Sequence, residues 1–186
     1  MGAGFLPIAF YKGKMMLLFG KERDRPNETA RGWADFGGGQ ESGETLFENA
    51  AREGAEELSG FLGGYKEIKK LMKTNKKYVI NYDTYRTYII LIDYDEKLPH
   101  YFNTQSNFLE EYFNDKMLFK TTMYEKEKIK WFSLDELKRK KKSFRNFYQN
   151  IVDLILKNKK DIVSKLKKKT RKNVKNNKKT KKNINL

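Results

Sequence analysis

The distribution of hydrophobic positions predicts a β-hairpin at the start of the chain. Gly4 to Tyr11 and Met15 to Phe19 are short apolar runs, and Lys12-Gly13 between them has the composition of a two-residue turn. Apolar runs joined in this way are typical of antiparallel strands. The polar stretch from Lys21 to Arg31 then predicts a loop that leads to the next ordered segment.

Helical periodicity follows over Thr45 to Leu58, where apolar residues recur at spacings of three and four. The apolar side of this predicted helix comprises Leu46, Phe47, Ala50, Ala51 and Leu58. Glu48 and Asn49 fall outside this set, so we expect both side chains to face solvent. The helix should pack its apolar side on the core.

The middle of the chain contains two further predicted strands. β-Branched and aromatic residues indicate strands over Lys77 to Tyr82 and Tyr85 to Tyr94, with Asn81 to Thr84 as their turn. An ordered segment from Tyr65 to Met72 precedes them. For Thr104 to Met117 a short helix and an ordered loop both fit, because the apolar residues there follow helical spacing.

The C-terminal part of the predicted domain contains one more strand and two helices. Ile129 to Phe132 predicts a last short strand. Ser133 is the expected cap of a helix that starts near Leu134, with Glu136 three residues beyond Ser133 as in a capping box. Ser143 to Leu156 predicts an amphipathic helix that packs on the rest of the domain.

The formal charge of +16 is concentrated at the C-terminal end of the 186-residue chain. From Lys157 to Leu186 there are 14 Lys and Arg residues against one acidic residue, Asp161, which leaves +3 for the rest of the chain. A Lys- and Asn-rich segment with few apolar residues cannot offset the entropy of ordering, so we expect disorder beyond roughly Lys168. The sequence therefore predicts a domain over 1–156 and a largely disordered basic tail over 157–186.

The basic tail has three interpretations. Its charge would attract RNA, DNA or an anionic membrane surface through salt-sensitive phosphate contacts, or it would act as a nuclear-import signal. The third interpretation is compositional bias, because Lys and Asn are abundant throughout the chain. A second basic cluster, Lys138 to Lys142 with Arg145, lies closer to the domain and is better placed to touch a bound polyanion, although a solvated helix end also explains it.

Two absences narrow the chemistry and the location. The chain has no cysteine, which excludes disulfides, thiolate catalysis and zinc–cysteine sites. No apolar run approaches the ~20 residues that span a bilayer, and the N-terminus lacks the features of a signal peptide. We therefore expect an intracellular, cytoplasmic protein, with a nuclear location left open by the basic tail.

The strongest candidate site combines a glycine run with an acidic helix face. Gly37-Gly38-Gly39 precedes the predicted helix, which carries Glu53, Glu56 and Glu57. Residues three and four apart share a helix face, so the three carboxylates project toward nearly the same point. Holding like charges together makes sense around a hard divalent cation such as Mg²⁺, which takes oxygen ligands and substrate phosphates.

Neighbouring residues would complete a cradle for a metal-bound diphosphate. Arg52 can pair with a carboxylate through its planar guanidinium, and Glu44 is its expected partner. The glycines would let the backbone turn tightly and approach a ligand, and a carbonyl there would add an oxygen to the metal. The alternative is an ordinary solvated helix face paired with lysines. However, the predicted helix has no lysine at matching offsets, and a surface helix does not need a triple glycine.

These residues resemble the signature of the Nudix hydrolase family, in which a glycine, a glutamate and an Arg-Glu-x-x-Glu-Glu segment recur at fixed spacing. The matching positions are Gly38, Glu44, Arg52, Glu53, Glu56 and Glu57. Gly54 stands where the family has an aliphatic residue, and Ser59 stands where it has glycine, with Gly60 one place later. Trp131 to Leu137 is similar to the closing segment of many Nudix domains. The resemblance covers roughly residues 5–138 and implies the α+β Nudix fold, a mixed β-sheet sandwiched between α-helices.

The resemblance also implies a reaction, the hydrolysis of a diphosphate that joins a nucleoside to another group, with Mg²⁺ or Mn²⁺. The implied metal ligands are Glu53, Glu56, Glu57 and Gly37. The implied catalytic residues are Glu53, Arg52, Glu44 and Glu57, with Glu53 the first choice among several candidates for the general base. Glu125 or Glu127 would supply a further carboxylate, unless both are surface residues paired with lysines. The expected contacts to the nucleotide-linked substrate are Gly37, Gly38, Gly39 and Trp33, where Trp33 is alternatively a core residue.

Two classes of function remain open at this point. In the first, the protein is an active pyrophosphohydrolase, and capped RNA or another polyanion such as a diphosphoinositol polyphosphate fits its basic segments. In the second, it is a degenerate Nudix fold that binds nucleotide or RNA without cleaving it. The intact set of Glu53, Glu56 and Glu57 argues against the second class. The oligomeric state stays open.

Overall fold

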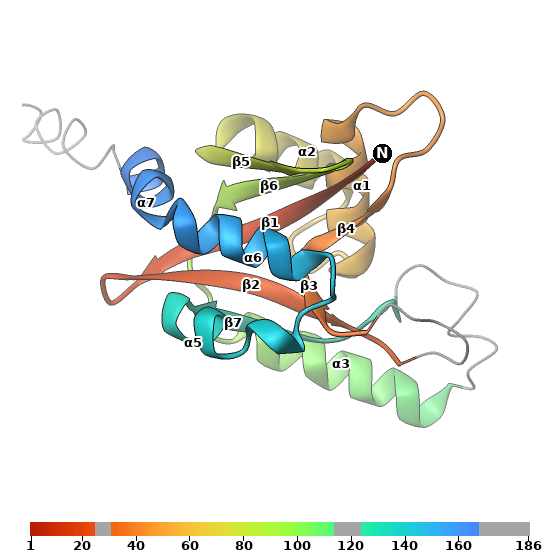
Figure 1. Ribbon diagram of the computed structural model, residues 1–186. Coiled ribbons are helices and arrows are strands. Elements are labelled where there is room, and N and C mark those ends of the chain that lie inside the picture. Colours follow the sequence, from red (N-terminus) through yellow and green to blue (C-terminus); the bar gives the residue numbers. More distant parts are fainter. Residues whose placement is uncertain (25–30, 114–123, 168–186) are drawn as a thin grey trace, which may run out of the picture.

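A computed structural model of the chain describes residues 1–24, 31–113 and 124–167 (Figure 1). The strands are β1 (Gly2–Tyr11), β2 (Lys14–Glu22), β3 (Trp33–Ala34), β4 (Phe36–Gly39), β5 (Lys77–Tyr82), β6 (Tyr85–Leu91) and β7 (Lys126–Ser133). The helices are α1 (Leu46–Glu57), α2 (Tyr65–Thr74), α3 (Leu98–Tyr112), α5 (Leu134–Arg139), α6 (Tyr148–Lys157) and α7 (Lys159–Lys167), with a short 3-10 helix, η2, at Lys141–Ser143.

β1 is the central strand of a mixed sheet. One of its edges pairs in parallel with β6, and β6 pairs with the antiparallel β5. The other edge is divided, because residues 2–5 pair with β4 and residues 8–11 pair with β2. β2 pairs in turn with β7 and β3. β4 and β2 therefore pair with the same edge of β1, one after the other along the strand. Both contain residues of the candidate site.

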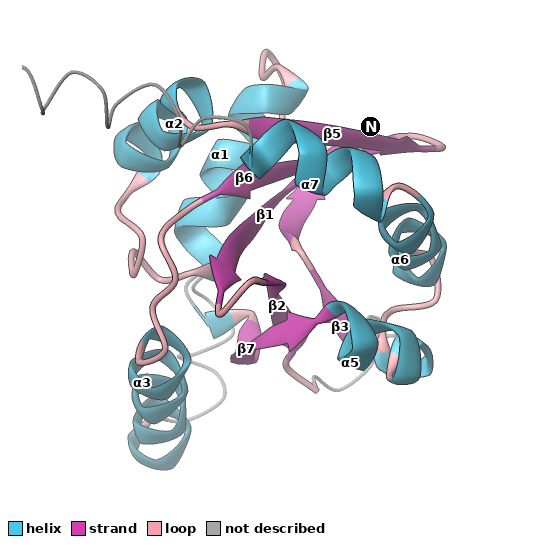
Figure 2. Ribbon diagram, turned by 90° about the vertical axis from the view of Figure 1, so that its left-hand side faces the viewer, coloured by secondary structure: helices cyan, strands magenta, loops and turns pink. Residues whose placement is uncertain are grey.

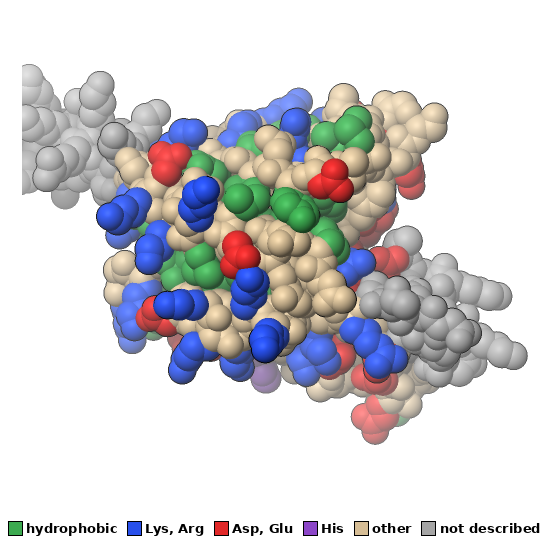
Figure 3. Space-filling view, viewed as in Figure 1, with side chains coloured by type: hydrophobic (Ala, Val, Ile, Leu, Met, Phe, Trp, Pro, Cys, Tyr) green, Lys and Arg blue, Asp and Glu red, His purple; other side chains and the backbone are tan. Residues whose placement is uncertain are grey.

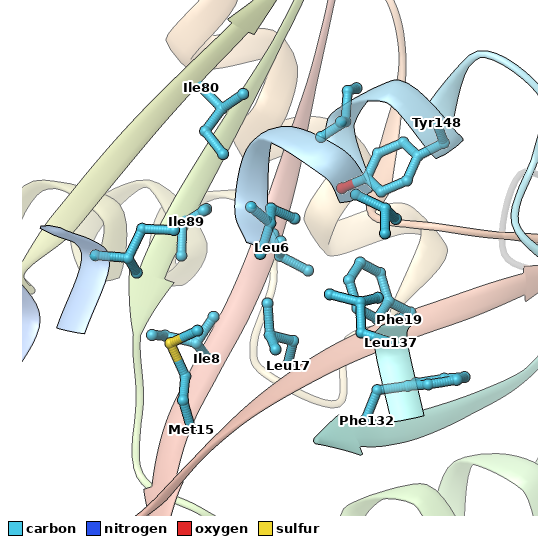
Figure 4. Close-up of a cluster of buried hydrophobic side chains, with 14 of the residues drawn as sticks. Leu6, Ile8, Met15, Leu17, Phe19, Ile80, Ile89, Phe132, Leu137 and Tyr148 are labelled. Atoms are coloured by element: carbon cyan, nitrogen blue, oxygen red, sulfur yellow. The ribbon is translucent and has the colours of Figure 1, made fainter. Parts of the chain in front are cut away.

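Helices cover both faces of the sheet (Figure 2). On one face α1, α2 and α3 enclose the α1-side cluster, which includes Leu18 and Phe36. On the other face α5, α6 and α7 enclose the α6-side cluster, part of which Figure 4 shows in close-up. Side chains of β1 alternate between the two, with Phe5 in the α1-side cluster and Leu6 and Ile8 in the α6-side cluster. The predicted α+β class, a mixed sheet sandwiched between helices, is confirmed.

The predicted strands lie where expected, with differences at their ends. The opening hairpin is β1 and β2, and the strand pair that follows α2 is β5 and β6, although β6 ends at Leu91 rather than Tyr94. β7 begins at Lys126 rather than Ile129. Residues 25–30, within the predicted loop from Lys21 to Arg31, lie outside the described residues.

The helices show similar differences. α3 starts at Leu98, six residues before the expected Thr104, and Leu98 and Phe102 extend its buried side. Residues 114–117 of that prediction lie outside the described residues. The capping box of α5 is confirmed, since Ser133 and Glu136 each accept from the backbone N–H of the other. No helix in the described part of the chain is both long and apolar enough to cross a membrane.

The first part of the predicted tail is a helix, which differs from the expectation of a largely disordered segment from 157 onward. α7 spans Lys159–Lys167, and Ile162 and Leu166 are buried in the α6-side cluster. These two residues are four apart and so share one face of the helix. Apolar burial on that face offsets the cost of ordering the lysines around it. The disorder predicted beyond Lys168 concerns residues outside the described part of the chain.

The basic cluster Lys138 to Lys142 lies on α5 and η2, on the face of the sheet opposite α1. Leu137 anchors this segment in the α6-side cluster. On the face of the molecule in Figure 3, Lys and Arg side chains are spread over the surface rather than gathered in one patch. Arg145 differs from the cluster, because its Nη1 lies 3.0 Å from Glu22 Oε1 at the end of β2.

Candidate functional site

Local hydrogen bonds fix both ends of α1. At the N-terminus, Thr45 and Glu48 form a capping box. At the C-terminus, the N–H groups of Ser59 and Gly60 donate to the carbonyls of Glu56 and Ala55, and both residues have positive φ, 50° and 74°. This is the pattern of a Schellman motif. It holds in place the last turn of α1, which carries two of the predicted site carboxylates.

Asn49 ties α1 to the sheet. Its Oδ1 accepts from Ala3 N at 2.8 Å, and its Nδ2 donates to the carbonyl oxygen of Gly39 at 2.8 Å. The side chain is fully buried, so the expectation that Asn49 faces solvent is wrong. An amide carries both a donor and an acceptor, and here it satisfies the backbone of two strands at once. Helical periodicity does not reveal such a requirement.

Gly37, Gly38 and Gly39 form strand β4, so the expected tight turn at these positions is wrong. They pair with residues 4, 3 and 2 of β1. A β-carbon on Gly38 would lie 2.5 Å from Glu53 Oε1, and one on Gly37 would overlap the hydroxyl of Tyr85. Backbone atoms of β1 also lie close to Gly37 and require glycine there, whereas a side chain at position 38 would displace the carboxylate of Glu53. A β-carbon on Gly39 would meet only open space.

Arg52 holds three carboxylates together, and we call the four residues Arg52, Glu44, Glu53 and Glu56 the Arg52 group. Nε of Arg52 donates to Glu44 Oε1 at 2.8 Å. Nη1 lies 3.0 Å from Glu53 Oε1 and 3.1 Å from Glu56 Oε2. Nη2 donates to the carbonyl oxygen of Gly39 at 3.1 Å, so the guanidinium also holds β4. The expected pairing of Arg52 with Glu44 is confirmed.

The Arg52 group carries an excess of negative charge. Its three carboxylates face one guanidinium, which leaves two negative charges when all are ionised. Burial raises the pKa of Glu53 to about 7 against the opposing effect of Arg52, and the charges of Glu56 and Glu125 add to the rise. The hydrogen bond from Arg52 holds the pKa of Glu44 below its ordinary value. A divalent cation would match this excess charge.

Glu57 belongs to a second set of charges, which we call the Lys126 group: Glu57, Lys126, Glu22 and Arg145. Lys126 Nζ lies 2.9 Å from Glu57 Oε1 and 2.5 Å from Glu22 Oε1, the oxygen that Arg145 also contacts. The side chains of Lys126 and Glu57 are 0% and 3% exposed. Burial opposes the charged form of Lys126, but the two carboxylates outweigh it and hold its pKa above the ordinary value.

Lys126 and Glu22 were not anticipated from the sequence. In a regular strand, Lys126 would face the same side as Phe132, which points into the α6-side cluster. The pairing of β2 with β7 shifts register next to Glu22, and Lys126 reaches Glu57 on α1 instead. The alternating acids and lysines at 125–128 give no sign of which lysine is buried.

The two glutamates considered as a further carboxylate differ in their surroundings. Glu127 lies 3.0 Å from Lys21 and 2.9 Å from Lys128, which is the surface pairing given as the alternative for it. Glu125 lies near enough to Glu53 for its charge to raise the pKa of that carboxyl. This placement favours Glu125 over Glu127 as the additional carboxylate.

Trp33 packs away from the Arg52 group. Its ring lies 4.9 Å from that of Phe132 at an interplanar angle of 74°, beside the α6-side cluster. Its carbonyl oxygen accepts from the backbone N–H of Arg145. Since this cluster lies on the sheet face opposite α1, the placement of Trp33 favours its interpretation as a core residue.

The Arg52 group fits a divalent cation. Oxygens of Glu53 and Glu56 lie 3.0 and 3.1 Å from one atom, Nη1 of Arg52, so both carboxylates converge on a single cationic point. Two carboxylates, water and substrate phosphates are a common ligand set for Mg²⁺. Within residues 1–24, 31–113 and 124–167, no three or more His, Asp or Glu side chains are already arranged around a metal position. The guanidinium of Arg52 and the ammonium of Lys126 lie between the carboxylates.

A mixed sheet between helices, with an acidic helix behind a glycine strand, defines the Nudix class of hydrolases. Comparison with protein families agrees, because residues 5–154 match the model of the NUDIX domain. The chain therefore belongs to this family. The match extends from β1 into α6 and includes every residue of the Arg52 and Lys126 groups. It confirms the predicted family and enzyme class, a hydrolase that acts on phosphorus-containing anhydrides.

Several solved structures have a similar fold. A binary complex of Ap4A hydrolase from C. elegans has a TM-score of 0.52 and 14% sequence identity, over 88% of this chain and 99% of that chain. A bifunctional NMN adenylyltransferase/ADP ribose pyrophosphatase from Francisella tularensis, complexed with AMP and Mn ion, has a TM-score of 0.46 and 18% identity, over 84% and 40%. No curated protein matches the chain. At 14% identity, the likeness to the C. elegans structure establishes the fold alone.

Proposed function

We propose that the protein is a Mg²⁺- or Mn²⁺-dependent pyrophosphohydrolase that cleaves a diphosphate linkage in a nucleoside diphosphate derivative. The observation that carries this proposal is the convergence of Glu53 and Glu56 on one point beside the glycine strand. The excess negative charge of the Arg52 group attracts a divalent cation. The open space at Gly39 leaves room for a ligand next to it.

The residues of the site have distinct proposed roles. Glu53 and Glu56 hold the metal ion, and the carbonyl of Gly37 is the first candidate for a backbone ligand. When bound, the metal ion offsets phosphate charge and lowers the pKa of a water molecule. Arg52, held by Glu44, keeps the two carboxylates in place. Glu57, which the sequence also predicts as a ligand, contacts Gly37 and Lys126.

Glu53 is our first choice for the group that takes the proton of the attacking water. Its Oε1 lies against Gly38 of the glycine strand, along which the diphosphate would lie. Glu125 is the candidate for a further carboxylate at this position, because its charge acts on Glu53. A general base must lie within hydrogen-bond reach of the attacking water. The position of each carboxylate is therefore a stricter criterion than its pKa.

The candidate substrates share a nucleotide or polyanion linked through a diphosphate. Capped RNA and a diphosphoinositol polyphosphate fit the charge of +16. Ap4A enters the set because the C. elegans hydrolase of similar fold bears its name. Contact of the basic tail with RNA, and a cytoplasmic or nuclear location, stay predictions.

A Nudix fold that binds nucleotide or RNA without cleaving it is the second candidate. The specific observation in its favour is that Arg52 and Lys126 already lie between the carboxylates. In this case Arg52 and Lys126 would take the place of a metal ion beside the carboxylates, and the phosphate of the ligand would bind without a metal ion.

Hydrolysis assays on the full chain distinguish the two candidates. The substrates are capped RNA, dinucleoside polyphosphates, nucleotide sugars, deoxynucleoside triphosphates and diphosphoinositol phosphates, each with and without Mg²⁺ or Mn²⁺. The proposal expects cleavage of at least one compound that stops on metal removal and in Glu56→Gln. Glu48→Gln is the matched control, since Glu48 is on the same helix but pairs with Lys69. Binding without cleavage across the panel would support the second candidate instead.

A separate truncation tests the RNA contact of the tail. Because Ile162 and Leu166 are buried in the α6-side cluster, the deletion should begin at residue 169 rather than at 157. If the tail contacts RNA phosphates, the shortened chain will bind RNA with a shallower dependence on salt than the full chain. An unchanged slope would remove residues 169–186 from RNA binding.

A further inference from the structure

Glu57 is the carboxylate of α1 with the least freedom to bind a metal ion. Both of its oxygens have partners, because Oε1 lies 2.9 Å from Lys126 Nζ and Oε2 accepts from Gly37 N at 2.8 Å. Its side chain is 3% exposed, against 32% for the adjacent Glu56. A metal ion at Glu57 would have to displace a buried partner, whereas at Glu56 it would replace a partly exposed contact with Arg52.

The charges of the Lys126 group are balanced without a metal ion. Along the group, Arg145, Glu22, Lys126 and Glu57 alternate in sign, and each contact is 3.0 Å or shorter. Two cations therefore face two carboxylates. A Mg²⁺ ion about 2.1 Å from Glu57 Oε1 would lie within about 5 Å of the ammonium that shares this oxygen, so like charges would repel.

We infer that Lys126 is a resident cation of the site, which occupies Glu57 and confines divalent metal ions to Glu53 and Glu56. The inference rests on the proposed function, since it assigns the charges of that same site. Glu57 then has a positioning role. It holds the N–H of Gly37 and so fixes the glycine strand against the last turn of α1.

Two consequences follow from this division of the carboxylates. Removal of the Glu57 charge should leave the metal affinity of the protein nearly unchanged. Removal of the Lys126 charge should uncover a second acidic pair, Glu57 and Glu22, whose oxygens both lie within 2.9 Å of the present ammonium position. A divalent cation can then take that position, because two carboxylates suffice for it.

Mn²⁺ binding measured by electron paramagnetic resonance tests the inference without any assay of activity. Free and bound Mn²⁺ are titrated for the wild type, Glu56→Gln, Glu57→Gln, Lys126→Met and the double variant Lys126→Met/Glu57→Gln. We expect Glu57→Gln to bind within about threefold of the wild type, and Glu56→Gln at least about tenfold more weakly. Lys126→Met should bind one ion more than the wild type, and the double variant should lose that ion.

The outcomes separate the inference from the proposed function. If Glu57→Gln weakens Mn²⁺ binding as much as Glu56→Gln does, Glu57 is a metal ligand and the inference is wrong. If the wild type binds no Mn²⁺, the proposed function itself is contradicted. Lys128→Met is the matched control for Lys126→Met, since Lys128 is an exposed lysine of the same strand. Should Lys126→Met fail to fold, the comparison of Glu57→Gln with Glu56→Gln still decides.

Discussion

The Arg52 group and the Lys126 group show how two neighbouring glutamates of one helix acquire different roles. Glu56 and Glu57 are consecutive in α1, yet Glu56 lies in the partly exposed Arg52 group and Glu57 in the buried Lys126 group. When its carboxylates are ionised, the first group has two negative charges in excess, while the second is balanced by its own lysine and arginine. The difference comes from the strand opposite α1, because β7 supplies Lys126 to one carboxylate and not to the other.

The comparison teaches that an acidic helix face does not by itself define a set of metal ligands. Helical spacing places Glu53, Glu56 and Glu57 near one another. Burial and ion pairing then decide which of them is available, since a buried charge needs a partner. In this protein the available pair is Glu53 and Glu56, and predictions on the two groups should differ accordingly.

The largest expected effect on stability is in the Lys126 group. Lys126→Met leaves the buried Glu57 and the partly buried Glu22 without their shared cation and should lower the free energy of unfolding by about 3 to 5 kcal/mol. Lys128→Met, which breaks an exposed pair, should change it by less than about 1 kcal/mol. Urea denaturation of both variants measures the difference. Equal effects would mean that Lys126 is not a buried partner of these carboxylates.

The largest expected effect on activity is in the Arg52 group. Glu56→Gln removes a proposed metal ligand and should lower kcat/KM for the substrate by about 100-fold or more, with little change in the melting temperature. Glu48→Gln, on the same helix, should retain activity within about twofold. Steady-state kinetics on any cleaved compound of the panel tests this. Near-normal turnover in Glu56→Gln would remove that residue from the proposed site.

A third buried carboxylate separates the effect of burial from that of ion pairing. Asp35 is 1% exposed and accepts from the hydroxyls of Tyr85 and Thr87, both at 2.8 Å. Burial raises its pKa from 3.8 to about 6, although the two hydroxyls oppose the rise. Between these pH values the folded protein keeps a proton that the unfolded chain releases, so this residue lowers stability as pH rises from 4 to 6.

Asp35→Asn removes this titration. The free energy of unfolding of the wild type, relative to that of Asp35→Asn, should fall by about 2 to 3 kcal/mol between pH 4 and pH 7. Urea denaturation at a series of pH values measures it. A difference that rises with pH would mean that the folded protein stabilises Asp35 in its charged form, contrary to the effect of burial.

The smallest expected effect concerns the glycine strand. Gly38→Ala places a β-carbon where Glu53 Oε1 now lies, which should shift that carboxylate and lower kcat/KM by about tenfold to 100-fold. Gly39→Ala meets open space and should have a smaller effect. Kinetics of the two variants side by side tests the contact. If Gly39→Ala were the more damaging, the ligand rather than Glu53 would require the glycines.

The parts of this structure that follow from local sequence could be predicted, and those that depend on distant partners could not. The hairpin, the helix α1 and the capping box of Ser133 with Glu136 rest on residues close in the chain. The burial of Asn49 depends on Ala3 in β1, 46 residues away, and on Gly39 in β4, which a loop separates from α1. The register shift that turns Lys126 toward Glu57 depends on β2, which lies about 100 residues earlier.

Gly54 illustrates the same limit within the family signature. When only the helix is considered, a glycine in place of the aliphatic residue removes a core contact. A β-carbon at position 54 would lie 2.9 Å from Cδ1 of Phe5, so the aromatic ring of β1 fills the space of the missing side chain. This contact between Gly54 and Phe5 is visible only when helix and strand are considered together.

Every role proposed for this site depends on Glu53 and Glu56 together binding a divalent cation. The most direct measurement is an electron paramagnetic resonance titration of Mn²⁺ into the full chain and into the double variant Glu53→Gln/Glu56→Gln, with circular dichroism to show that both are folded. We expect the wild type to bind Mn²⁺ saturably and the double variant to lose this binding. Equal Mn²⁺ binding by the two proteins would contradict this expectation.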